Sequence, residues 1–272
     1  MKRISIILSI LIISTTLIHA QEKKSNSFGI NLGMGNLQKQ DLIYSPFIAR
    51  DWSPMNVLLE YEHQGKVNQK ATLRFGQFYY FVGEPFSYYS RDIEYAKYPH
   101  SFTNLDLNYS LTANIIDSDV WTVSAGGRIR NRFQISNFEF GHAGQFSYNL
   151  STGLDAQVNA SYRSGRHALQ SELAIPLFSS LARSPYTGQD DLYLERITVH
   201  GDLKIFWEQL KSSTLQSWGT SQMLDINISY KYSLSQRWDL GFTYLFVMNL
   251  HSSPLQYTSI ENIFYIGTAF KF

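Results

Sequence analysis

The chain has 272 residues, and its 23 Lys and Arg against 22 Asp and Glu give no reason to expect nucleic acid as a partner. It contains no cysteine, which excludes disulfides, thiolate metal sites and the lipid-anchor cysteine of a lipoprotein. Aromatic residues make up 15% of the chain, enough to fill a soluble core or to form belts at the two interfaces of a membrane.

The N-terminus predicts an export signal. Lys2 and Arg3 precede an apolar run over residues 4–18, which is too short to span a bilayer comfortably as a helix. Ala20 stands at the expected cleavage point, so we expect a signal peptide over residues 1–20 and one mature domain over residues 21–272. No later window approaches the ~20 consecutive apolar residues of a spanning helix, so membrane residence would have to come from strands.

The rest of the chain alternates apolar and polar residues with the period of a β-strand. The clearest segments are 57–63, 70–80, 103–114, 120–131, 153–163, 167–176, 196–207, 223–232, 237–247 and 260–272. Weaker candidates at 27–35, 41–50 and 144–150 raise the count. We therefore expect an all-β fold, an antiparallel up-and-down transmembrane β-barrel of about twelve strands, in the range of about 10 to 14.

Segment 223–232 shows the two faces: Ile226 and Ile228 alternate with Asp225 and Asn227. In a soluble sheet the apolar face is buried, whereas in a membrane barrel it faces lipid and the polar face lines the interior. Alternation alone does not choose between these. The choice rests on the export signal, the terminal Phe272 and the tryptophans at predicted strand ends. These are Trp52, Trp121, Trp207 and Trp238.

The connections predict which end of the barrel faces which side. Short segments at 115–119, 164–166 and 233–236 are typical of periplasmic turns, and longer ones at 82–102, 177–195 and 249–259 of outer loops. Counting strands back from a periplasmic Phe272 nevertheless puts 164–166 outside. Either a strand is hidden between residues 208 and 222, or one outer loop is very short and 177–195 faces inward.

The last strand carries a family resemblance. Phe264, Ile266, Phe270 and Phe272 alternate with less apolar residues up to the C-terminus, which resembles the closing strand of bacterial outer-membrane β-barrel proteins. A mature chain beginning at Gln21 is also similar to secreted proteins of Bacteroidetes. The resemblance implies residence in the outer membrane, contact with its lipid and insertion by the barrel-assembly machinery. It implies no particular functional residue.

Charged residues of inward parity are the candidates for lining the lumen. They are Asp106, Arg128, Arg130, Asp155, Glu172, Asp202, Lys204, Asp225, Lys231 and Asp239. With Arg163 and Lys271, which also have inward parity, six acids face six bases, so a narrow barrel would be cross-linked by charge-assisted hydrogen bonds. The alternative is a water-filled pore with opposed acidic and basic strips.

The loop at 82–102 is rich in tyrosine and charge. Tyr88, Tyr89, Tyr95 and Tyr98 are candidates for contact with a sugar or with another protein. The same loop could instead fold into the barrel mouth as a plug, or join an interfacial belt.

His63 is the best single candidate for catalysis, because lipid-modifying barrels use a His–Ser pair at the wall. It has no serine beside it, and an interfacial histidine in a turn is the preferred interpretation. No spacing typical of a metal or nucleotide site occurs, so we expect no cofactor and no metal.

Three functions remain open at this stage. The first choice is a channel, porin-like, for small polar solutes or a sugar. The alternative is a sealed structural or partner-binding barrel that acts through its outer loops. A lipid-modifying enzyme comes third.

Overall fold

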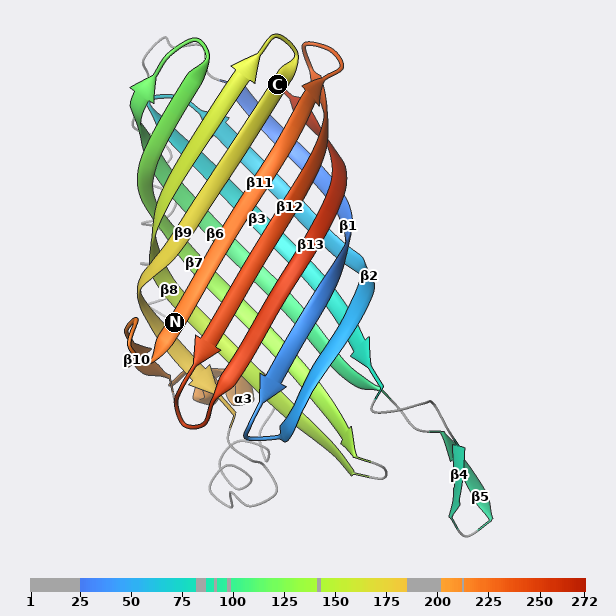
Figure 1. The fold of residues 1–272 in the computed structure, drawn as a ribbon. Coiled ribbons are helices and arrows are strands. Elements are labelled where there is room, and N and C mark those ends of the chain that lie inside the picture. The colour runs from blue at the N-terminus through green and yellow to red at the C-terminus, as the bar shows by residue number, and fades with distance from the viewer. Residues whose placement is uncertain are drawn as a thin grey trace.

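The computed structural model describes residues 25–81, 87–90, 92–96, 99–140, 143–184, 202–211 and 213–272. The expected signal peptide at residues 1–20 lies outside the described residues. The described chain forms an 11-stranded antiparallel sheet, in which the short β10 (Thr214–Gln216) adds to β9 and the other ten strands close into a barrel (Figure 1). The barrel strands are β1 (Ser25–Asp41), β2 (Ser45–Gln64), β3 (Val67–Tyr80), β6 (His100–Asp117), β7 (Trp121–Phe140), β8 (Ala143–Ser164), β9 (His167–Arg183), β11 (Ser221–Ser233), β12 (Trp238–His251) and β13 (Tyr257–Lys271).

Each barrel strand pairs with the next barrel strand along the chain, which confirms the up-and-down order. The last strand, β13, pairs with β1 from Ser27 opposite Lys271 to Asp41 opposite Tyr257. This pairing closes the barrel between its first and last strands, so neither of them has a free edge. The strands run from 13 to 22 residues, longer than the ~9–11 that cross a bilayer, so the wall extends beyond any membrane it spans.

The strand count is ten and not about twelve, because predicted segments merge. Segments 41–50 and 57–63 both belong to β2, and 144–150 and 153–163 both belong to β8. Between Gly33 and Gly35 of β1, the paired residue of β2 changes from Asn56 to Ser53, so β2 has one extra residue there. This bulge interrupts the alternation of side chains by which a strand is recognised in the sequence. Segment 196–207 was predicted as a strand, but residues 202–207 belong to the helix α3 (Asp202–Lys211). Residues 196–201 lie outside the described residues.

The two ends of the barrel differ. At one, here called the terminal end, the chain termini of the barrel meet: the Asn26 N–H donates to the Phe272 carbonyl at 3.1 Å, and the Phe272 N–H donates to Asn26 at 2.9 Å. The short turns at 65–66, 118–120, 165–166 and 234–237 lie at the same end. The opposite end, the loop end, carries the long connections 81–99 and 184–220. With 196–207 removed from the strand count, β9 pairs directly with β11, and the 164–166 turn no longer conflicts with the others.

The outward face carries an apolar band, as parity predicts. On β1 the exposed side chains Phe28, Ile30, Leu32 and Met34 are 42% to 63% accessible, and polar Asn36 follows towards the loop end. Exposed aromatic residues gather near the terminal end. They are Tyr61, Tyr109, Trp121, Tyr162 and Trp238. Trp121 and Trp238 begin their strands as predicted, whereas Trp52 lies inside β2 and Trp207 lies in α3.

Two additions decorate the loop end. Helix α3 packs Leu210 against Tyr148, Leu150 and Ala182, whose positions in the ladders put them on the outer wall. A two-stranded hairpin, β4 (Ser87–Ser90) and β5 (Ile93–Ala96), lies beyond the barrel end in Figure 1. The described part of this loop is therefore a projecting hairpin, and it does not form the plug that the sequence left open.

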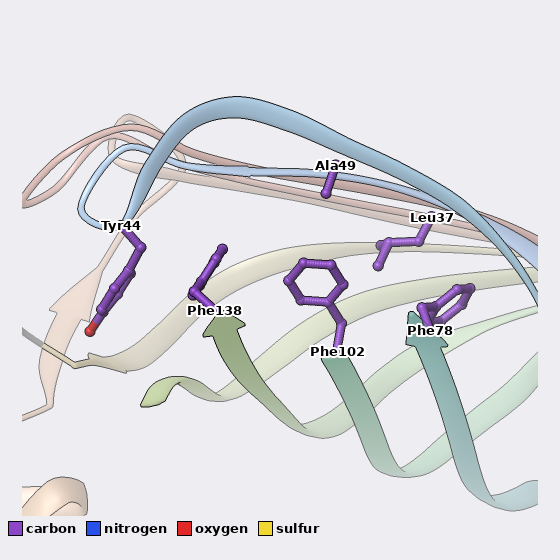
Figure 2. Packing of buried hydrophobic residues seen from close by; sticks show 6 residues of the cluster. All are labelled: Leu37, Tyr44, Ala49, Phe78, Phe102 and Phe138. Atoms are coloured by element: carbon purple, nitrogen blue, oxygen red, sulfur yellow. The ribbon is translucent and has the colours of Figure 1, made fainter. Parts of the chain in front are cut away.

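The apolar core lies inside the barrel at the loop end. Leu37, Tyr44, Ala49, Phe78, Phe102 and Phe138 form this aromatic layer, and each is at most 8% exposed. Figure 2 shows the three phenylalanine side chains at their strand ends, on the side of β1 and β2, which carry Leu37 and Ala49. The rings of Tyr44 and Phe138 stack at 5.2 Å between centroids. The layer fills the barrel interior where the strands leave the apolar band.

Candidate functional site

The middle of the barrel interior is filled by charged side chains. We call this group the central charge network. Its members are Arg74, Arg128, Arg130, Arg132, Asp106, Asp155, Asp225 and Glu261, and their side chains are 0% to 13% exposed. They come from β3, β6, β7, β8, β11 and β13.

Strand register builds one part of this network. Asp106 on β6 stands opposite Arg74 on β3 and Arg132 on β7, and both ladders point these side chains inward. Asp106 therefore accepts hydrogen bonds from Arg74 at 2.7 Å and from Arg132 at 3.2 Å. Arg128 and Asp155 are opposite one another in the same way and are 2.6 Å apart.

Contacts across the lumen build the rest. Glu261 on β13 accepts from Arg74 at 2.6 Å, and Asp225 on β11 accepts from Arg132 at 3.0 Å and from Arg128 at 2.6 Å. The network thus ties β11 and β13 to β3 and β7, which are not their neighbours in the sheet. Charge-assisted pairs in a low-dielectric interior are strong, provided that both partners stay in place.

A second cluster lies towards the terminal end. Lys70 contacts Glu60 at 3.1 Å, Glu62 at 3.5 Å and Glu172 at 2.5 Å, and Lys231 contacts Glu62 at 3.1 Å. A cavity of about 50 Å³ lies between this cluster and the central charge network, and residues of both groups line it. It has room for water.

The interior between the central charge network and the aromatic layer is also packed. The Tyr257 hydroxyl donates to Gln134 at 2.6 Å, and Lys39 donates to the Ser136 hydroxyl at 2.5 Å. The Lys39 ammonium lies 4.9 Å from the centre of the Phe102 ring. The polar side chains above the central charge network are therefore in direct contact with the aromatic layer.

The terminal end holds two wider spaces. Two cavities of about 300 and 280 Å³ open there, and both are lined by Glu62, Gln64, Arg163 and Gln170. The lysine–glutamate cluster forms their inner wall, because Lys70 and Glu172 line the first cavity and Lys231 lines the second.

The predicted lumen residues fall into four groups. Asp106, Arg128, Arg130, Asp155 and Asp225 belong to the central charge network, and Glu172 and Lys231 to the cluster next to it. Asp239 pairs with Lys271 at 2.7 Å at the terminal end. Asp202 and Lys204 were predicted on a strand, but they lie in α3 on the β9–β11 connection, and Lys204 is exposed.

Of the predicted outer-loop residues, Tyr88, Tyr89 and Tyr95 lie in the β4–β5 hairpin, and Tyr89 is 73% exposed. The side chains of Tyr88 and Tyr95, and all of Tyr98, lie outside the described residues. The hairpin keeps the expectation of an outer-loop contact surface open.

Several interior residues were missed from the sequence. Arg74, Lys70, Arg132 and Glu261 carry much of the ion pairing, but they were not among the residues predicted to line the lumen. Extending the parity of Arg128 and Arg130 by one more step along β7 identifies Arg132. A single sequence does not indicate which residues form ion pairs across the lumen.

The histidines do not assemble an accessible hydrolytic site among the described residues. His63 is 2.8 Å from the Asn26 side chain oxygen. A serine–histidine contact occurs elsewhere, at 3.0 Å between the Ser221 hydroxyl and His251 Nδ1, and counting register outward from the β11–β12 turn would have predicted it. Both residues are only 2% to 3% exposed, so a substrate has no access to them in this structure.

Over the residues that the structure describes, no three His, Asp or Glu side chains are grouped so as to hold a metal ion. In the same part of the chain, no helix combines the length and the apolar character needed to cross a membrane.

Comparisons with known proteins give the fold. No family model and no curated protein sequence matches this chain. Among solved structures, the outer membrane protease OmpT from Escherichia coli matches 95% of this chain and 100% of its own, with a TM-score of 0.51 at 7% identity. The Pseudomonas putida toluene transporter TodX matches with a TM-score of 0.33 at 8% identity, covering 93% of this chain and 90% of its own. Ail of Yersinia pestis matches with 0.31 at 11% identity, covering 92% and 100%. The fold and the polar, charge-filled interior define a ten-stranded antiparallel β-barrel of the outer-membrane type.

Proposed function

We propose that this protein is a bacterial outer-membrane barrel with a sealed interior, and that it acts by binding at the loop end. The observation that carries the proposal is the central charge network. Its arginine and carboxylate side chains reach across the lumen and are at most 13% exposed. A conducting pore keeps its charged lining hydrated and apart, so that an ion can enter and leave.

The aromatic layer supports the proposal as a second obstruction. Phe78 and Phe102 are 0% and 1% exposed, so no water path is left beside them. A solute would have to displace both the ion pairs and the rings to cross the barrel. These features favour the sealed barrel over the channel that was the first expectation from the sequence.

The proposed orientation of the barrel in the membrane rests on the difference between its two ends. Short turns are typical of the periplasmic end of an outer-membrane barrel, which supports a periplasmic position for the terminal end. In this proposal a signal peptide exports the chain and the barrel-assembly machinery inserts it. The apolar band contacts the membrane lipid. The loop end, with α3 and the β4–β5 hairpin, then faces the outside, where an exposed residue such as Tyr89 can meet a partner.

Planar-bilayer conductance tests the sealed interior. We expect the purified protein to give no current above that of the bare bilayer, whereas a porin reconstituted in parallel gives stepwise openings. Stable single-channel steps from this protein would overturn the proposal in favour of the channel.

Cysteine labelling tests the placement, because the native chain has no cysteine to interfere. In intact cells, a bulky membrane-impermeant maleimide should label Tyr89→Cys and leave Lys66→Cys, in the turn between β2 and β3, unlabelled. The reverse pattern would place the loop end in the periplasm.

A further inference from the structure

The terminal end of the barrel contains an open polar hollow that the proposed function does not use. Its two parts are the cavities of about 300 and 280 Å³ described above, which share the lining residues Gln64 and Arg163. The Arg163 guanidinium donates to the Gln64 side chain oxygen at 3.0 Å, and so joins the end of β8 to the end of β2 where the two parts meet. The volumes are close to the lower limit of small-molecule pockets, about 300 Å³.

The first part of the hollow is lined largely by hydroxyl and amide groups, together with ion-paired residues and the Asp117 carboxylate, which already accepts hydrogen bonds from Asn114 and Thr122. Examples of the hydroxyl and amide groups are Ser110, Thr112, Asn114, Thr122, Ser124 and Asn159. Each of these groups both donates and accepts hydrogen bonds, and tyrosine, tryptophan and phenylalanine side chains do not line the cavity. Such a lining matches a ligand with many hydroxyl groups and little apolar surface.

The second part of the hollow is basic. Its acids are already paired, Glu62 with Lys231 at 3.1 Å and Asp239 with Lys271 at 2.7 Å. Arg163 and Arg166 also line it, and neither forms an ion pair with any residue that the structure describes. Two guanidinium groups without a carboxylate partner are suited to a carboxylate brought by a ligand, because the planar fork can bind both of its oxygens.

We propose that the terminal-end hollow binds an acidic saccharide, with its hydroxyl groups in the first part and its carboxylate at Arg163 and Arg166. The lysine–glutamate cluster forms the inner wall of the site, so the ligand enters and leaves by the same end. The site lies at the opposite end of the barrel from the surface assigned to partner binding, and its occupancy does not depend on whether the interior conducts.

Calorimetric titration of the refolded full-length barrel in detergent tests the proposal, with D-glucuronate as the probe. We expect saturable binding of glucuronate, and binding weaker by at least about tenfold for D-glucose, which lacks the charge, and for acetate, which lacks the ring. Arg163→Gln and Arg166→Gln should each weaken glucuronate binding by about tenfold. A faster gel migration before boiling verifies that each variant is folded.

Lys66→Gln is the matched control. It removes the same charge at the same end, and like Arg163 and Arg166 it is exposed, but it lines neither cavity, so binding should be unchanged. Absence of saturable glucuronate binding would overturn the proposal. So would equal affinity for acetate, which shows simple anion binding, or an equal loss in Lys66→Gln, which shows attraction to surface charge alone.

Discussion

Asp225→Asn is the most direct test of the central charge network. The Asp225 side chain is 7% exposed, and it accepts hydrogen bonds from Arg128 at 2.6 Å and from Arg132 at 3.0 Å. The amide keeps the size of the side chain but removes its charge. Both guanidinium groups then remain buried with one carboxylate fewer, and breaking a buried pair in this way costs about 3–5 kcal/mol.

Asp239→Asn is the matched comparison at the terminal end. Asp239 pairs with Lys271 at 2.7 Å, and the lysine side chain is 34% exposed, so water can solvate the ammonium once its partner is neutral. The pair resembles a surface ion pair in this respect, and its loss should cost about 1 kcal/mol or less. The two variants change the same atoms, so the difference between them reports the surroundings.

Urea titration of the refolded barrels in lipid vesicles, followed by tryptophan fluorescence, measures both. The midpoint difference multiplied by the slope gives the change in the free energy of unfolding, provided that the slope is the same in all three proteins. We expect Asp225→Asn to lose several times more stability than Asp239→Asn. Equal losses, or a smaller loss for Asp225→Asn, would refute the assignment of a buried, partner-dependent network to the barrel interior.

Three further changes test other parts of the fold. Ile228 is 41% exposed on the outer face, and Ile228→Arg should lower the stability of the barrel by about 2–4 kcal/mol, as measured by refolding into lipid vesicles. Asn227→Arg on the inner face should cost much less. The opposite order would mean that the apolar face is the core of a soluble protein. Phe102→Ala should lower the free energy of unfolding by about 3–5 kcal/mol in urea titration. It should leave the barrel non-conducting, because the central charge network remains. A conducting variant would mean that the aromatic layer alone seals the barrel. Deleting Phe272 removes two backbone hydrogen bonds to Asn26 and should impair outer-membrane assembly without affecting export, as measured by cell fractionation; normal assembly would contradict the resemblance of the last strand.

The faces of the strands were predictable because the side-chain period in a strand is two. Once Ile226 and Ile228 are assigned outward, Asp225 and Asn227 must point inward, and the structure has them so. Strand ends and number were less predictable. The Ser53–Pro54 bulge in β2 breaks the alternation without ending the strand, so one strand looked like two.

Segment 196–207 shows where a periodic pattern misleads. Leu203, Ile205 and Trp207 are spaced as in a strand, but Leu203, Phe206 and Leu210 are also spaced as on one face of a helix. The ten strands already close the barrel, and β9 keeps an edge only beyond its pairing with β11, where the short β10 adds to it; residues 202–211 form α3 instead. The local sequence fits both a strand and a helix, and the closed barrel decides between them.

Partners across the lumen were beyond prediction for a related reason. Arg74 and Glu261 are 187 residues apart, and only the diameter and stagger of the closed wall bring them to 2.6 Å. The sequence supports the inference that inward charges balance, but it does not say which acid meets which base.

The position of Glu261 has a consequence for how the barrel is completed. Glu261 belongs to the final strand, and it reaches Arg74 only when β13 has zipped onto β1 and the cylinder is shut. Until that moment Arg74 has Asp106 as its acid, and a half-made sheet lacks the last carboxylate of the network. The ion pair therefore stabilises the closed barrel relative to an intermediate in which β13 is not yet paired with β1. Partly closed forms should be scarce, and dissociation of the last strand should be slow.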